Sequence, residues 1–119
     1  MARIAAGYVQ GMAALRCLYA RELPAKAGDV TDAAARVAAR WDPAGREKLY
    51  RLAHRLAGSA AIFGFPGVSQ AAAALEAYVA SASPKGSPPV SKRRPRLKVL
   101  SDALRRAFLE ESGRGQPSP

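Results

Sequence analysis

Apolar residues recur along this chain at the three- and four-residue spacing of an α-helix, and this spacing constrains the fold most. The apolar stripes are Met12, Leu15, Tyr19 and Leu23; Val30, Ala34, Val37 and Trp41; Leu49, Leu52, Leu56 and Phe63; Val68, Ala72, Leu75 and Val79; and Leu97, Leu100, Leu104 and Phe108. No segment shows the sustained alternation with β-branched residues that is typical of strands. The sequence therefore predicts an all-α protein.

A proline separates the first two stripes. Pro24 lacks a backbone N–H and disfavours helical backbone in the residue before it, so we expect it to end or kink the first helix. Asp29 or Thr31 would then cap the second helix. The segment before Pro24 is therefore predicted to be an additional N-terminal helix.

The third helix has the clearest boundaries. Asp42 is a good N-cap, and Pro43 suits the first helical position. The helix should run to about Phe63, where Gly64 can adopt the left-handed conformation that ends a helix. Pro66 then opens the fourth helix.

The end of the chain combines basic residues with proline. A fifth helix is expected from about Pro95 to Glu111, preceded by a basic, proline-rich loop at residues 83–95 and followed by a disordered tail at 113–119. Short connections between amphipathic helices favour antiparallel packing. We therefore predict one domain, residues 1–112, as an antiparallel four-helix bundle with the additional N-terminal helix.

The net charge of +10 raises the question of an anionic partner. Residues 83–98 contain six basic residues and no acidic one. Nucleic acid or anionic lipid could bind such a stretch. Nucleic acid would bind at residues 92–98, but the stretch lacks the aromatic residues on which a single-strand binder stacks bases. We interpret it as a solvated loop and keep nucleic-acid binding as a less favoured alternative.

The scarcity of cysteine and histidine excludes several kinds of site. The chain has one cysteine, Cys17, and one histidine, so it can form neither an internal disulfide nor a cysteine-based metal cluster, and we expect no metal site. No apolar run approaches the roughly 20 residues that a membrane span needs. We expect a cytoplasmic, monomeric protein with no membrane insertion.

The single histidine, His54, lies on the third predicted helix. A helix advances about 100° per residue, so His54 points about 200° away from both Leu52 and Leu56 on the buried stripe. It is therefore predicted to face away from the core. The expected site residues around it are Tyr50, Arg51, Arg55, Ala57, Gly58 and Ala61.

The surface beside His54 has small side chains where a solvated helix would carry polar ones. Gly58 in a helix interior costs about 1 kcal/mol relative to alanine, and Ala57 and Ala61 add no charge. Such a surface lets another protein approach the imidazole. Arg51 and Arg55 supply positive charge for an anion there.

An exposed imidazole can act without a complete active site of its own. A hydrolytic triad needs a nucleophile and an acid that orients the histidine. This sequence does not provide both at a recognisable spacing from His54. A neutral imidazole is available near neutral pH and can accept and surrender a phosphoryl group. The partner can supply the metal and the rest of the site.

The segment "LAHRLAGSAAIFGFPGVSQAAAALE" resembles the core of histidine-containing phosphotransfer (HPt) domains, whose motif is roughly His-x-Leu-Lys-Gly-Ser. A glycine then ends the helix, and Leu-Glu lies near the centre of the next one. The matching residues are His54, Leu56, Gly58, Ser59, Gly64, Leu75 and Glu76.

The resemblance implies a phosphorelay intermediate with His54 as phosphoacceptor rather than an autonomous enzyme. Its partners would be a response-regulator receiver domain, a hybrid sensor histidine kinase, or both. It implies no cofactor in this chain, with magnesium held by the receiver. Ala57 stands where the family often has lysine, and Arg51 or Arg55 would have to replace that charge. A receiver-binding module of the same fold that transfers no phosphate is the main alternative.

Overall fold

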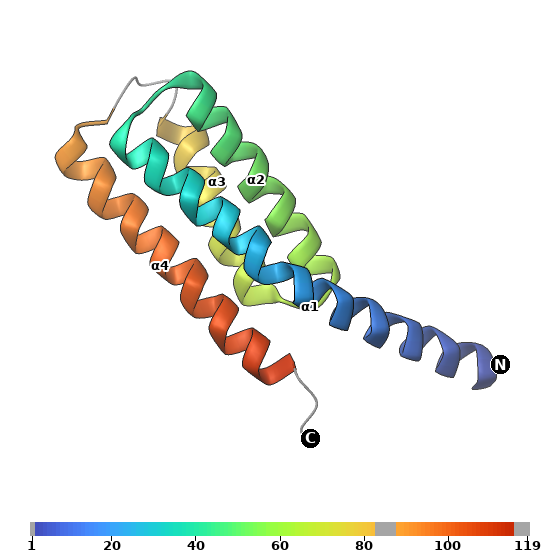
Figure 1. Cartoon of the computed structure of the whole chain (residues 1–119). Helices are drawn as coiled ribbons and strands as arrows, with labels where there is room; N and C mark the ends of the chain where they lie inside the picture. Colours follow the sequence, from blue (N-terminus) through green and yellow to red (C-terminus); the bar gives the residue numbers. More distant parts are fainter. Residues whose placement is uncertain (1, 83–87, 116–119) are drawn as a thin grey trace.

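The protein consists of four α-helices, α1 to α4, that pack as a bundle (Figure 1). The computed structural model describes residues 2–82 and 88–115. The helices are α1 (Ala2–Ala39), α2 (Pro43–Ile62), α3 (Pro66–Ala82) and α4 (Val90–Gly115). No strand occurs in these two ranges, and the predicted all-α bundle is confirmed.

The prediction that Pro24 separates two helices is wrong. The expected first and second helices form one continuous helix, α1, with Pro24 inside it. The proline is exposed, whereas Leu23 and Ala27 beside it are buried, so packing on both sides offsets the lost backbone hydrogen bond. The expected additional helix is therefore the beginning of α1, which extends past the end of the bundle (Figure 1).

The expected caps after Pro24 are wrong for the same reason. Asp29 and Thr31 lie inside α1 rather than at a helix start. The Thr31 hydroxyl donates to the Gly28 carbonyl within the helix, at 3.0 Å. Leu15 of the first predicted stripe is also exposed, whereas Tyr19, one turn later on α1, is buried.

The predicted boundaries of α2 are confirmed. The Gly45 N–H donates to Asp42 Oδ1 at 2.6 Å, with Pro43 at the first helical position. Gly64 follows the helix with a φ of 84°, in the left-handed region that favours glycine. Arg16 of α1 donates from Nε to the Phe63 carbonyl at 3.2 Å, which joins α1 to this end of α2.

The helix expected as the fifth is α4, and it begins earlier than expected. It starts at Val90 rather than near Pro95, so residues 90–95 are helical, and it continues to Gly115 rather than Glu111. Residues 88–89 of the predicted loop are not helical, and residues 83–87 lie outside the described residues. Residues 113–115 of the predicted disordered tail belong to α4, and residues 116–119 lie outside the described residues. Near its other end, Glu111 accepts the Gly67 and Val68 N–H groups, at 3.1 and 2.7 Å, and so caps α3.

Arg93 shows why the solvated-loop interpretation is wrong at this position. Its side chain is buried, with 7% of the residue exposed. Nε donates to the Ala38 carbonyl at 2.9 Å, and Nη2 donates to the Ala39 carbonyl at 3.3 Å. The last carbonyls of a helix have no partner within the helix, so Arg93 of α4 caps α1.

The four helices lie around one apolar core. α1 packs against α2 and α4, and α3 packs against the same two helices. The edge between α2 and α3 is therefore opposite the edge between α1 and α4. The largest fully buried side chains are Leu23, Val30, Val37, Leu49, Phe65, Val68, Leu75, Leu97 and Leu104.

Candidate functional site

His54 lies on α2 with its ring largely in solvent. Its side chain is 66% exposed, as the helix phase predicted. Its Nδ1 lies 2.9 Å from Glu76 Oε1 on α3. A carboxylate can only accept, so Nδ1 carries the proton and donates. In the neutral ring, Nε2 is then the nitrogen with a free lone pair.

Tyr50 restrains the same ring from one turn earlier on α2. Its ring centroid is 6.0 Å from that of His54, and the two planes are inclined by 7°, so the rings stack. The hydrogen bond to Glu76 fixes one ring nitrogen and Tyr50 limits rotation of the plane. The imidazole is thus oriented from two sides although it is exposed.

Gly58 opens the surface beside His54. A Cβ atom built at Gly58 would meet no heavy atom within 4 Å in the described structure. Packing within this chain therefore does not require glycine here. Ala61 is also exposed on α2, and Ala73 and Ala77 are exposed on α3. The exposed surface of α2 beside His54 thus carries small side chains at Gly58 and Ala61.

Ala57 does not lie on this open surface, contrary to the sequence interpretation. It is half-buried and packs against the core. Its carbonyl accepts a hydrogen bond from Ser69 Oγ of α3 at 2.7 Å. Ala57 therefore lies at the contact between α2 and α3, on the same side of His54 as Glu76.

The two expected arginines are four residues apart on α2 and therefore lie on neighbouring turns of the same face. Both are exposed, and neither has a side-chain hydrogen bond or ion pair with a described residue. Arg55 lines a 150 Å³ cavity with Lys26 and Asp29 of α1. Arg51, three residues before His54, lies closer to the face of the helix that carries the imidazole. By helix phase, Arg51 is thus the nearer of the two arginines to the imidazole.

Glu76 is the residue that sequence reasoning did not place in the site. It belonged to the matched motif, but its contact with His54 depends on how α3 packs against α2. One signal was available, since Glu76 is the only charged residue between Pro66 and Ala82. Its side chain is 22% exposed, so a charged group is partly buried beside the imidazole.

Neither a metal site nor a membrane span is found in the described parts of the chain. No three His, Cys, Asp or Glu side chains among those residues are grouped so that they could hold a metal ion. None of the helices in the described ranges is both long and apolar enough to cross a membrane.

Comparison with known proteins gives one match. The family model described as the Hpt domain matches residues 14–112, which include all of the site residues above. No curated protein and no solved structure matches the chain.

Proposed function

Because the chain belongs to the Hpt domain family and is thus a histidine phosphotransfer module of two-component signalling, we propose that His54 carries the transferred phosphoryl group. Hpt domains interact with receiver domains and kinases in phosphorelays.

One observation carries the proposal. The chain's only histidine is exposed on a helix, and its Nδ1 is held by Glu76 at 2.9 Å. This contact leaves Nε2 as the nucleophilic nitrogen and directs the opposite edge of the ring away from α3. A residue with a purely structural role would gain little from such exposure.

The reaction then needs few groups from this chain. The Nε2 lone pair attacks the phosphorus of a receiver's aspartyl phosphate, so an N–P bond forms while the P–O bond to the aspartate breaks. The aspartate leaves as a carboxylate. The phosphorylated ring still holds its proton on Nδ1 and is positively charged, and the Glu76 carboxylate stabilises that charge. Transfer to a second receiver reverses these steps.

The phosphoryl oxygens need positive charge nearby. Arg51 has no partner among the described side chains and can turn toward them. The family's usual lysine would project from position 57, at the contact with α3. We therefore expect Arg51 to replace it from the other side of His54, and magnesium to come with the receiver.

Phosphotransfer assays test the proposal on the whole chain. The protein is incubated with a radiolabelled, phosphorylated receiver domain, and the label on this chain is followed with time. We expect one acid-labile, base-stable label, as a phosphoramidate gives. His54→Gln should remove it, whereas Arg106→Gln, an exposed change on α4, should not.

Two results would contradict the assignment. One is persistent labelling of the His54→Gln protein, and the other is an acid-stable label on the unmodified chain. Receiver binding that survives His54→Ala, combined with no label on the unmodified chain, would instead identify a receiver-binding module that transfers no phosphate.

A further inference from the structure

A groove runs between α1 and α4, on the edge of the bundle opposite the one that carries His54 and Glu76. Its volume is about 280 Å³. The residues that line it are Thr31, Ala34, Ala35, Ala38, Ala39, Arg94, Leu97, Lys98, Ser101, Asp102 and Arg105. Nothing in phosphotransfer at His54 uses this groove.

The α1 side of the groove is apolar and is formed mainly by short side chains. Four alanines line it, at positions 34, 35, 38 and 39, so no side chain on this side reaches beyond Cβ except that of Thr31. Thr31 is buried, and its hydroxyl is already bonded within α1. The α1 side therefore offers contact to apolar groups and no competing charge.

Ser101 of α4 is the serine that lines the groove. The residue is 7% exposed, and its hydroxyl forms no hydrogen bond with a described residue. The hydroxyl is not among the buried side-chain atoms that lack a partner in the described residues, which are Trp41 Nε1 and Ser112 Oγ, so it is open to water. A polar group bound in the groove could take the place of that water.

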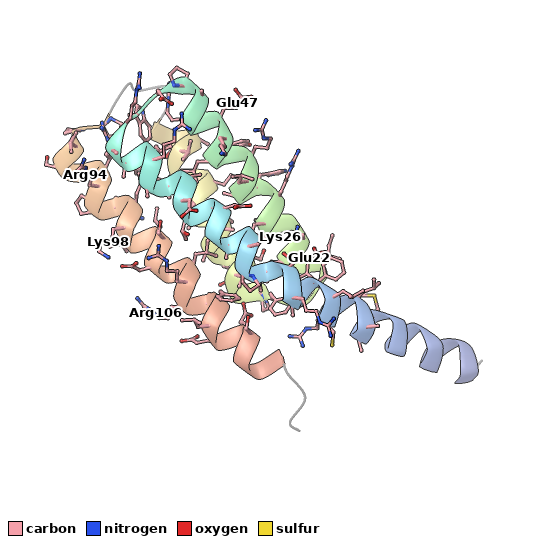
Figure 2. All side chains as sticks on the ribbon, viewed as in Figure 1. Glu22, Lys26, Glu47, Arg94, Lys98 and Arg106 are labelled. Atoms are coloured by element: carbon pink, nitrogen blue, oxygen red, sulfur yellow. The ribbon has the colours of Figure 1, made fainter. Side chains whose placement is uncertain are left out.

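The α4 side of the groove is positively charged. Arg94, Lys98 and Arg105 lie along one face of the helix (Figure 2 labels the first two). Asp102 offsets part of this charge, with Oδ2 at 3.1 Å from Lys98 Nζ and Oδ1 at 3.4 Å from Arg105 Nη1. Arg94 has no ion pair with a described carboxylate, so it is free to bind one.

We propose that this groove docks an acidic amphipathic helix of a partner protein. The apolar face of that helix would lie against the four alanines of α1, and its carboxylates would bind Arg94 and Lys98. A carboxylate or backbone carbonyl would accept from Ser101. Charge complementarity of this kind sets partner choice and orientation.

The dimensions of the groove favour a helix. Its lining spans residues 31–39 on α1 and 94–105 on α4, which at about 1.5 Å per residue corresponds to roughly 12–16 Å. Two to three turns of a helix occupy that length. A second copy of the chain fits less well, because each copy carries a net charge of +10 and would bring the same cationic groove.

The position of the groove allows simultaneous binding. The edge between α1 and α4 is opposite the edge between α2 and α3, so an occupant would leave His54 accessible to a receiver. The groove therefore suits a tethering partner that holds this module near its kinase or receiver while phosphoryl transfer continues.

The test uses a designed helical peptide of about three turns, with leucine and alanine on one face and glutamate on the other. Binding of the labelled peptide to the whole chain is followed by fluorescence anisotropy and located by amide chemical-shift changes. We expect shifts at the groove and not around His54. A peptide with lysine in place of glutamate should not bind there.

Two pairs of variants separate docking from general charge attraction. Arg94→Glu should weaken binding about tenfold or more, whereas Arg106→Glu, with the same charge change at a residue of α4 that does not line the groove, should change it much less. Ala35→Leu fills the groove from an exposed position and should weaken binding, whereas Ala74→Leu on the exposed surface of α3 should not. Circular dichroism checks the fold of each variant.

Several outcomes would overturn this proposal without touching phosphotransfer. They are equal loss of binding in Arg94→Glu and Arg106→Glu, shifts centred on His54, or no binding by the glutamate peptide. A concentration-dependent dimer that Ala35→Leu dissociates would assign the groove to a second copy instead. Labelling of His54 should stay unchanged in Arg94→Glu and Ala35→Leu, so the two proposals fail independently.

Discussion

Glu76 on α3 lies 2.9 Å from His54 on α2, and this one contact determines which nitrogen of the exposed imidazole is free to react. The carboxylate accepts from Nδ1, so Nε2 keeps its lone pair. The two residues are 22 positions apart in the chain and meet because α2 and α3 pack side by side.

Replacement of Glu76 should slow phosphorylation of His54 without changing the fold. Glu76→Ala removes both the acceptor and the charge that stabilises the phosphorylated ring. We expect the rate of phosphoryl transfer to His54 to fall by roughly tenfold or more. Glu76→Gln keeps an acceptor, so its transfer rate should lie between those of the unmodified chain and Glu76→Ala. Rapid-quench transfer from a phosphorylated receiver measures the rates. Equal rates for all three proteins would show that Glu76 does not orient the ring.

Substitution at Gly58 should separate stability from docking. The Cβ position is open, so Gly58→Ala should raise the free energy of unfolding by up to about 1 kcal/mol through helix propensity. Gly58→Gln should leave the fold intact but obstruct a partner that approaches His54. Urea unfolding and receiver titration provide the two measurements. Receiver affinity unchanged in Gly58→Gln would place the docking surface elsewhere.

A lysine introduced at position 57 tests whether Arg51 supplies the positive charge for the phosphoryl group on His54. In Ala57→Lys, the aliphatic stem can follow the contact with α3 while the ammonium group reaches the phosphoryl oxygens. We expect a longer phosphohistidine lifetime or faster transfer. The effect should be larger when Arg51→Gln is also present, because the new lysine then supplies the missing charge. Equal kinetics in the unmodified chain, in Arg51→Gln and in the double variant, together with no effect of Ala57→Lys alone, would argue against a role for either cation.

Arg93 should stabilise the fold, unlike the basic residues around it. Arg93→Gln leaves the Ala38 and Ala39 carbonyls without their donor, and we expect a loss of about 2 kcal/mol in the free energy of unfolding. Arg96→Gln makes the same charge change at an exposed position and should cost less than about 0.5 kcal/mol. Thermal unfolding followed by circular dichroism compares them. Similar losses in both proteins would refute the capping role of Arg93.

The stability of the protein should fall at alkaline pH because of Tyr19. Burial raises the pKa of Tyr19 above its ordinary value of 10.0, although the hydrogen bond with Ser59 acts in the other direction. A group whose pKa is raised by folding contributes stability below its unfolded pKa and loses it as the pH rises through the folded pKa. The free energy of unfolding should therefore decrease above about pH 10.

Tyr19→Phe provides the control for this pH dependence. The variant has no ionisable phenol at position 19, so its stability should fall less steeply above about pH 10. Part of the slope should remain, because burial also raises the pKa of Tyr78. Urea unfolding at a series of pH values gives both curves. Identical slopes would show that Tyr19 does not contribute.

Much of the fold could be predicted because it depends on local spacing and caps. The apolar stripes defined the helices, and Asp42 and Gly64 marked the boundaries of α2 through backbone geometry that neighbouring residues determine. The same periodicity showed that His54 faces away from the core. These features follow from positions only a few residues apart, which a single sequence displays directly.

The tertiary structure decided the features that depend on contacts between distant residues. Pro24 was expected to end or kink the first helix, but α1 continues through it, because burial of its neighbours against other helices outweighs the lost hydrogen bond. Arg93 resembled a solvated charge until α4 brought it to the open carbonyls of α1. Glu76 reaches His54, and Ala57 leaves the open surface, only because α3 packs against α2. Local propensity is weaker than packing between helices, and that packing depends on the whole chain at once.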